Sequence, residues 1–237
     1  AMGLDAPDDA AGPIDLWQAT ELLAYDADNP SSVVGSLRLA RQNARGLREV
    51  LATEVWEALN RTYHELEGHL RGARIFGPHQ FFRWVRDRVA LITGLADSVL
   101  LHDDGWRFLT TGRCLERVDM TARLLGAVPG SASASRWSGV LVSCGANDAF
   151  LRTYGGDIDR TKVLSVLLLD PEFPRSVNYS LGQVEVCLDQ IDGTVQSGPR
   201  RHIRPRGSNA AREVGRIRSE LAYSDPVTLA RCLLYTS

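Results

Sequence analysis

The stretch from Arg113 to Leu125, RCLERVDMTARLL, decides the fold class of this chain. It is a strong helix former that carries charges of both signs within an apolar pattern. At about 100° per residue, one side of the helix gathers apolar residues: Phe108, Leu115, Val118, Ala122 and Leu125. Another side mixes charged with large apolar residues: Arg113, Glu116, Arg117 and Arg123 with Trp106, Leu109, Met120 and Leu124. This charged side is therefore either partly buried and internally paired, or a recognition surface.

Helical periodicity extends over most of the chain on both sides of this stretch. The expected helices are Leu16–Tyr25, Ser32 to about Leu51, Thr53 through Leu66, Pro78–Leu101, Trp106–Val128, Arg136–Tyr154, Arg160–Leu169, Pro174–Val195 and Asn209–Ala222. Glycine-, proline- and serine-rich segments separate them: Gly72–Gly77, His102–Gly105, Pro129–Ser135 and Ser197–Gly207. No segment stands out with the alternating pattern of a strand. The sequence predicts an all-α bundle of long, mostly antiparallel helices.

The composition is that of an ordinary globular protein. The chain has 237 residues, of which 44% are hydrophobic and 24% charged, and its net charge of −2 argues against a general polyanion binder. Lys162 is the only lysine among 27 basic residues, so the others are arginines. Arginine suits bidentate recognition of carboxylates and other anions. A GC-rich genome that favours arginine codons also explains this bias, and we prefer that explanation.

The cysteines and the apolar segments bear on the compartment. Cys114, Cys144, Cys187 and Cys232 form no C-x-x-C pair, and we expect reduced thiols in a cytoplasmic protein. No apolar run reaches the roughly 20 residues that a membrane span needs. The first residues lack the basic and apolar regions of a signal peptide. The sequence thus predicts a cytoplasmic protein that interacts with neither membranes nor nucleic acid.

Glu116 and Asp119, spaced i and i+3, are the strongest candidates for acid–base or metal chemistry. However, Arg113, Arg117 and Arg123 lie within one or two turns of them. Neighbouring guanidinium groups favour the ionised carboxylates, which suits ion pairs better than proton transfer. We therefore expect structural pairing, with Glu116 and Arg117 at least half buried and paired with other helices.

No other pattern indicates a catalytic, metal or cofactor site. His64 and His69 are five residues apart and diverge on a helix, and H-E-x-x-H is absent. Nucleophile-elbow, P-loop and dinucleotide-binding motifs are also absent. Tyr154-Gly155-Gly156-Asp157 follows a helix rather than a strand, so we interpret it as a helix end. The sequence predicts no catalytic residue, no metal and no cofactor.

Four arginines form a stripe on one side of the expected helix after Ser32. Arg38, Arg41, Arg45 and Arg48 are spaced i, i+3, i+7 and i+10. Like charges on adjoining turns repel one another unless a partner answers them. The partners are either internal carboxylates or an external phosphate, nucleotide or acidic peptide. The internal candidates are Glu49, Glu54, Glu116 and Asp119, and we favour internal pairing.

The same segments carry a family resemblance. The matching stretches are Asp28–Ser32, Ala40–Arg45, Glu54–Asn60, Gly105–Phe108, Gly112–Arg123, Tyr154–Asp159 and Leu167–Ser176. In this order they resemble the bacterial alpha-E domain family, named for its Glu-Arg motif. The resemblance implies an all-helical domain without an established activity. It also implies an association with circularly permuted ATP-grasp proteins and transglutaminase-like proteins, and so with peptide ligation or modification.

The resemblance also sets the expected domain limits and function. We expect a loose N-terminal segment of a truncated domain at 1–25, an alpha-E-like helical domain at 26–224 and a tail at 225–237. The last residues of the tail, from Cys232 on, resemble translated sequencing-adapter read-through. The favoured function is a non-catalytic helical partner or scaffold for an ATP-grasp-type or transglutaminase-like protein, or for its peptide substrate. The alternatives are an enzyme of peptide or amide chemistry and an anion-binding module.

Overall fold

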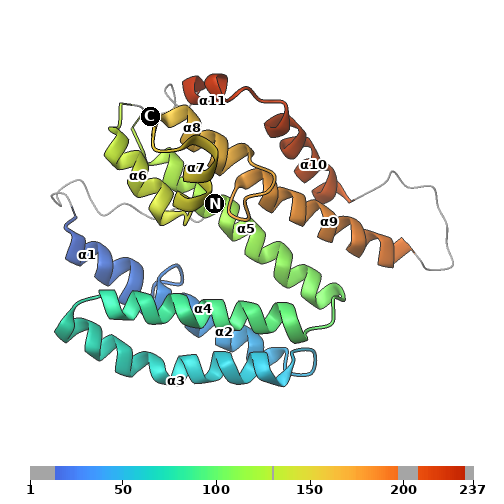
Figure 1. Ribbon diagram of the computed structural model, residues 1–237. Coiled ribbons are helices and arrows are strands. Elements are labelled where there is room, and N and C mark those ends of the chain that lie inside the picture. The colour runs from blue at the N-terminus through green and yellow to red at the C-terminus, as the bar shows by residue number, and fades with distance from the viewer. Residues whose placement is uncertain (1–13, 130, 197–207, 233–237) are drawn as a thin grey trace. The chain divides into compact units, whose positions relative to one another are not determined.

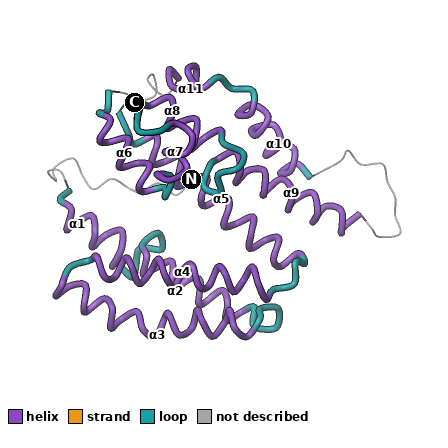
Figure 2. Tube along the Cα trace, viewed as in Figure 1, coloured by secondary structure: helices purple, strands orange, loops and turns teal. Residues whose placement is uncertain are grey.

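The computed structural model describes residues 14–129, 131–196 and 208–232. All regular structure within these ranges is helical, without a strand (Figure 2). The prediction of an all-α fold is thereby confirmed. The chain forms two compact units, one ending at Leu101 and the other beginning at His102, both drawn in Figure 1. The expected domain at 26–224 therefore comprises parts of two units.

The first unit is built on a long pair of helices, α3 and α4, that lie side by side (Figure 1). Its elements are α1 (Leu16–Thr20), the π-helical turn η1 (Glu21–Tyr25), α2 (Val33–Gly46), α3 (Thr53–Phe76) and α4 (His79–Val99). Gly77 connects α3 to α4 at φ 92°, a left-handed conformation that glycine adopts readily. The edge of the Tyr25 ring packs on Phe81 in the core, with ring centroids 5.3 Å apart. The segment 16–25 is therefore part of the fold, although the sequence placed it in a loose N-terminal segment.

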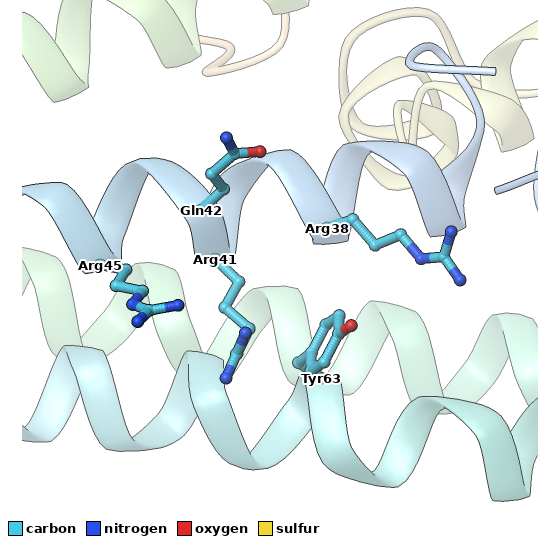
Figure 3. A pocket seen from close by; sticks show the side chains of 5 residues that line it. All are labelled: Arg38, Arg41, Gln42, Arg45 and Tyr63. Atoms are coloured by element: carbon cyan, nitrogen blue, oxygen red, sulfur yellow. The ribbon is translucent and has the colours of Figure 1, made fainter. Parts of the chain in front are cut away.

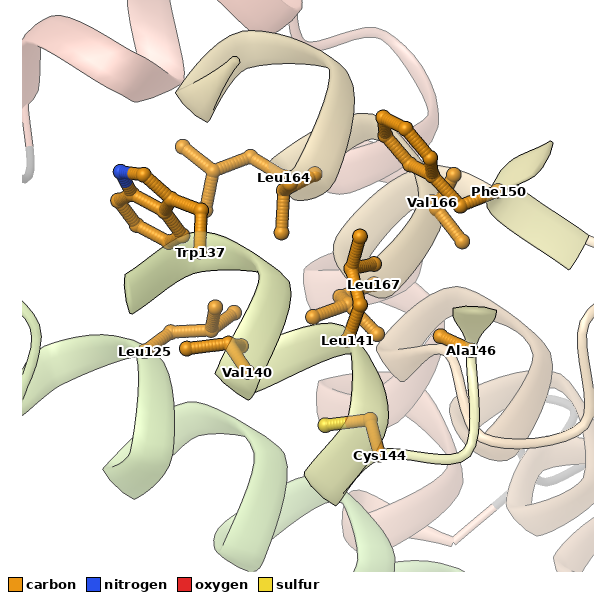
Figure 4. Packing of buried hydrophobic residues seen from close by; sticks show 11 residues of the cluster. Leu125, Trp137, Val140, Leu141, Cys144, Ala146, Phe150, Leu164, Val166 and Leu167 are labelled. Carbon is orange, nitrogen blue, oxygen red and sulfur yellow. The ribbon is translucent and has the colours of Figure 1, made fainter. Parts of the chain in front are cut away.

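The second unit is built around α5 and α9, which pack along each other. Its elements are α5 (Asp104–Gly126), α6 (Ala134–Ser143), α7 (Asn147–Tyr154), α8 (Arg160–Leu164), the π-helical turn η2 (Ser165–Leu169), α9 (Val177–Gln196), α10 (Asn209–Ala222) and α11 (Pro226–Cys232). Its core brings α6, α7, α8 and η2 together around Leu141, Phe150, Leu164 and Leu167, none of which is accessible to solvent (Figure 4). This core fixes the position from which α9 starts.

Several helix boundaries differ from the expected ones. α3 continues through Gly72 to Phe76, because one glycine inside a long helix costs only about 1 kcal/mol. The expected helix from Arg136 to Tyr154 is broken at Gly145, whose φ of 61° ends α6 before α7 begins. α2 ends at Gly46 rather than near Leu51. The expected tail contains α11, which packs against α8.

The two units share a repeated segment that the sequence analysis missed. Asp170 and Ser176 follow Asp26 and Ser32 by the same interval (170 − 26 = 144 and 176 − 32 = 144). The register holds without a gap from the N-cap of one short helix to the start of a long one. Its identical pairs include Asp15 and Asp159, Asp26 and Asp170, Pro30 and Pro174, Ser32 and Ser176, and Leu37 and Leu181. Thus α1, η1 and α2 correspond to α8, η2 and α9.

Several hydrogen bonds of the repeated segment occur in both copies. Asp26 N–H donates to the Glu21 carbonyl (2.9 Å), as Asp170 N–H does to that of Ser165 (3.1 Å), and each bond ends the π-helical turn. The hydroxyl of Ser32 donates to the Asp26 carbonyl, and that of Ser176 to the Asp170 carbonyl. Each serine then caps its long helix by accepting the N–H three residues on, at 2.9 and 3.0 Å. The same backbone device therefore launches α2 and α9.

Candidate functional site

Three arginines of the stripe lie together on α2 and face α3. Ser32 sets the start of α2, so the i, i+3, i+7 spacing places Arg38, Arg41 and Arg45 along one side. Figure 3 shows Arg41 and Arg45 pointing from α2 toward α3, with the Tyr63 ring of α3 between Arg41 and Arg38. The spacing therefore brings these three arginines together, whereas Arg48, the fourth residue of the stripe, lies beyond the end of α2.

An open cleft lies between these side chains. Its volume is about 340 Å³, and it is lined by Arg38, Arg41, Gln42, Arg45 and Tyr63. Arg38 and Arg45 are exposed, whereas Arg41 and Tyr63 are partly buried. Neither Gln42 nor the Tyr63 hydroxyl makes a hydrogen bond with another described residue. We call this the arginine cleft.

Aromatic rings and one amide of α3 hold Arg41 and Arg48 in place. The Arg41 Nε donates to Asn60 Oδ1 at 2.9 Å, and its guanidinium carbon lies 4.4 Å from the centroid of the Tyr63 ring. Arg48 lies beyond the end of α2, and its guanidinium carbon is 4.2 Å from the centroid of the Trp56 ring. A ring face attracts a cation without neutralising it. These contacts therefore fix the guanidinium planes and leave the terminal N–H groups of Arg41 available.

The expected carboxylate partners are absent from the cleft within the described part of the first unit. Glu49 and Glu54 form no ion pair there, and neither lines the cleft. The internal pairing expected with these two residues was therefore wrong. The physical reason is that Trp56, Asn60 and Tyr63, at i, i+4 and i+7, occupy the side of α3 that faces the stripe. Pairing with Glu116 and Asp119 of the second unit stays a prediction.

The corresponding positions of the second unit carry the opposite charge. The positions 144 residues after Arg41, Arg45 and Arg48 are acidic: Glu185, Asp189 and Asp192. Glu185 pairs with Arg218 of α10 at 2.5 Å. Arg218 packs over Gly182, the counterpart of Arg38: a Cβ there would lie 3.4 Å from its Nε. The second copy thus has an internal ion pair where the first has the arginine cleft.

The Glu-Arg helix, α5, buries a different side from the one expected. Phe108 is 61% exposed and Leu115 44% exposed, so neither is a core residue. The buried side consists of Thr110, Cys114, Thr121 and Leu125. Small side chains at three of these positions let α9 pack closely against α5. The expected apolar side was therefore wrong for Phe108 and Leu115.

Glu116 and Arg117 of α5 do not form the buried pairs that the sequence predicts. Glu116 is exposed and Arg117 partly buried, and neither makes an ion pair within the described part of the second unit. Asp119 pairs with Arg123 one turn along the same helix at 2.7 Å, and both are exposed. This hydrogen bond raises the pKa of Arg123. Arg113 is partly buried and has a partner.

The arginine cleft has the chemistry of binding rather than of catalysis. Its lining contains guanidinium, amide and phenol groups, without a carboxylate, thiol or imidazole among the described residues. Elsewhere, Cys114, Cys144 and Cys187 are buried, and burial raises the pKa of the Cys144 thiol, which makes it a weaker nucleophile. Over the described ranges, no cluster of histidine, cysteine and acidic side chains could hold a metal ion.

The sequence matches a helical domain family along almost its entire length. Residues 2–234 match Alpha-E, described as a predicted alpha-helical domain with a conserved ER motif, so this chain belongs to the Alpha-E family. Glu116-Arg117 lies in the stretch through which the sequence resembled that family. Among the helices that the structure describes, none has both the length and the apolar character needed to cross a membrane.

Curated relatives from two mycobacteria are much longer than this chain. An uncharacterised protein of Mycobacterium bovis is 24% identical over 195 residues, which is 78% of this chain and 22% of that protein. An uncharacterised protein of Mycobacterium tuberculosis is similar to the same extent. This chain thus spans about a fifth of the length of these relatives. No solved structure matches the chain.

The arginines of the cleft were predicted from the sequence, but the residues of α3 that contact them were not. The sequence indicated a helix through Trp56, Asn60 and Tyr63 but no contact of these residues with the arginines. A usable signal was present, because these three residues share one side of a helix that directly follows the stripe.

Proposed function

We propose that this chain is a non-catalytic helical partner domain that binds an anionic group through its arginine cleft. One observation carries the proposal: three arginines on one side of α2 line a cleft whose described walls contain no carboxylate. Like charges held together repel, and an anion relieves that repulsion. Guanidinium groups bind carboxylates and phosphates with two parallel hydrogen bonds.

The proposed partner is an ATP-grasp-type or transglutaminase-like protein, or the peptide on which it acts. The family resemblance supports this part of the proposal, since it implies peptide ligation or modification. Such a reaction involves carboxylate and phosphate groups, which are the anions that suit the cleft. The proposed compartment is the cytoplasm, and the buried thiols of Cys144 and Cys187 support it.

An enzyme of peptide or amide chemistry is the weaker alternative. Such an enzyme needs a nucleophile or base within hydrogen-bond reach of the bound group. The lining of the cleft contains none among the described residues, apart from the phenol of Tyr63. Orientation and charge stabilisation by the arginines alone would make the domain an accessory to a partner's active site.

Calorimetric titration of the whole chain tests the binding function. Inorganic pyrophosphate and a short glutamate-containing peptide serve as probes, at low and physiological salt. We expect at least one of them to bind, more weakly at higher salt because ions screen exposed charges. The double variant Arg41→Gln/Arg45→Gln should lose this binding while it keeps the helical circular dichroism spectrum. Binding of neither probe by the wild-type chain contradicts the proposal.

Arg71→Gln is the matched control. Arg71 is also an exposed arginine of the first unit, but it pairs with Glu67 one turn away on α3 and does not line the cleft. The substitution Arg71→Gln removes one positive charge from the same unit, as each cleft substitution does. Equal losses in Arg71→Gln and in the cleft variants would show that net charge, and not the cleft, drives binding.

A pull-down with an ATP-grasp-type protein encoded next to this chain tests the proposed partner. We expect co-purification that the double cleft variant weakens and Arg71→Gln does not. Co-purification that is unaffected by the double variant would assign the contact to another surface. Its absence with both an ATP-grasp-type and a transglutaminase-like neighbour contradicts the partner role.

A further inference from the structure

We propose that the ligand of the arginine cleft is an extended acidic peptide segment rather than a phosphate or a nucleotide. This inference rests on the proposed anion-binding function and specifies its ligand class. It depends on the spacing of the arginines, on the way they are held, and on the comparison with the second copy of the repeat.

The arginines form a row rather than a ring. At about 1.5 Å of rise per residue, Arg38 and Arg45 are about 10 Å apart along α2, and Arg41 and Arg45 about 6 Å. A single phosphate cannot contact both ends of such a row. In an extended peptide, side chains of residues i and i+2 are on the same side and about 7 Å apart. Two carboxylates in that spacing therefore match Arg41 and Arg45.

The cleft also lacks the groups that usually bind phosphate. Phosphate sites in proteins commonly use backbone N–H groups at a helix N-terminus or in a glycine-rich loop. The described residues that line this cleft include no glycine and none from the first turn of a helix. The first turn of α2 is capped by Ser32, whose hydroxyl accepts the Gly35 N–H. The cationic donors that line the cleft are guanidinium groups, and the paired N–H groups of a guanidinium match the two oxygens of a planar carboxylate.

The central arginine is prepared for a planar partner. Arg41 has its Nε occupied by Asn60 and one face of its guanidinium on Tyr63. Its remaining edge can donate two parallel N–H bonds to one carboxylate. The Tyr63 hydroxyl, which has no hydrogen-bond partner among the described residues, can donate to a peptide carbonyl. A short acidic segment thus finds both charge and backbone partners.

In the second copy of the repeat, a row of like charges has a side chain of opposite charge beside it. There the acidic side of α9 carries Glu185 and Asp189 with the same spacing as Arg41 and Arg45. Glu185 pairs with a guanidinium, that of Arg218. Arg41 and Arg45 of the first copy have the same spacing with the opposite charge, and no carboxylate lines their cleft among the described residues. An acidic segment supplies them.

A competition experiment on the whole chain tests the ligand class. The probes are an acetylated hexapeptide with glutamate at its second and fourth positions, the same peptide with glutamine there, and inorganic pyrophosphate. We expect the glutamate peptide to bind about tenfold more tightly than either other probe, since one charge-assisted hydrogen bond gives about that factor. Arg45→Gln should weaken it about tenfold, and Arg71→Gln less than about twofold.

The outcomes separate the ligand class from the binding function. Pyrophosphate that binds more tightly than the glutamate peptide, and displaces it, overturns the acidic-peptide inference but leaves anion binding intact. Equal binding of the glutamate and glutamine peptides also overturns it, because the carboxylates then contribute nothing. Binding of no probe overturns the inference and the proposed function together.

Discussion

The segments from Asp15 to α2 and from Asp159 to α9 contain the same elements in the same order, but the charged sides that follow from Arg41 and Glu185 have opposite signs. Both contain a capped short helix, a π-helical turn, a serine-closed loop and a long helix. Their differences include Gly35, whose counterpart is Tyr179, and the charged sides of the long helices. Comparison of the two copies separates the residues that build the fold from those that give the first unit a ligand site.

Gly35→Ala should have the largest effect on stability, and only the first copy depends on glycine there. A Cβ at this position would lie 2.0 Å from the Asn29 carbonyl oxygen, which is backbone and cannot rotate away. Overpacking of this kind costs about 3 kcal/mol in free energy of unfolding. Urea denaturation measures the change. Gly46→Ala in the same helix is the control, because its Cβ has no neighbour within 4 Å. A loss no larger than that of the control would refute the close approach.

Ser32→Ala and Ser176→Ala should have similar, intermediate effects, because both copies use the same device. Each substitution removes a helix cap and leaves a carbonyl without its donor, at a combined cost of about 2 kcal/mol. Ser98→Ala, in which an exposed serine of α4 is removed, should change stability by less than about 0.5 kcal/mol. Chemical denaturation of the three variants compares them. A large loss in only one of the two capping variants would break the equivalence of the copies.

Glu185→Gln should have the smallest effect on stability. Glu185 and Arg218 are partly exposed, and pairs of this kind contribute less than about 1 kcal/mol. The variant sharpens the comparison in another way, since it frees Arg218 of its carboxylate. Thermal unfolding at low and high salt measures the loss of stability and shows whether it comes from the lost charge pair. A loss above about 2 kcal/mol would mean that the Glu185–Arg218 pair contributes substantially to the stability of the fold. The first copy, which has Arg41 in place of Glu185, would then lack that contribution.

The sequence predicted the helical fold well, because hydrophobic periodicity and capping residues are local signals. Ser32 and Gly77 marked real boundaries for that reason. The buried side of α5 could not be predicted in the same way. Thr110, Cys114 and Thr121 are buried there because α9 approaches closely, and that contact joins segments far apart in the sequence.

The candidate site was likewise predicted where local spacing decides it and missed where a contact between helices decides it. The arginine stripe follows from helical spacing alone and was identified from the sequence. Its partners depend on which side of α3 meets α2, so Asn60 and Tyr63 were missed and Glu54 was wrongly preferred. The repeat was detectable, since Asp26 to Ser32 and Asp170 to Ser176 share a fixed interval. Its meaning needed the structure, because only the hydrogen bonds show that the two segments form the same turn.

Hydrogen exchange of the whole chain, with and without the glutamate peptide, tests most directly the claim that only the first copy is a binding site. Mass spectrometry resolves the peptides of α2 and α3 from those of α9 and α10. The account predicts slower exchange in α2 and α3 when the peptide is bound, with unchanged exchange in α9 and α10. Protection of α9 and α10 instead, or equal protection of both copies, would contradict it.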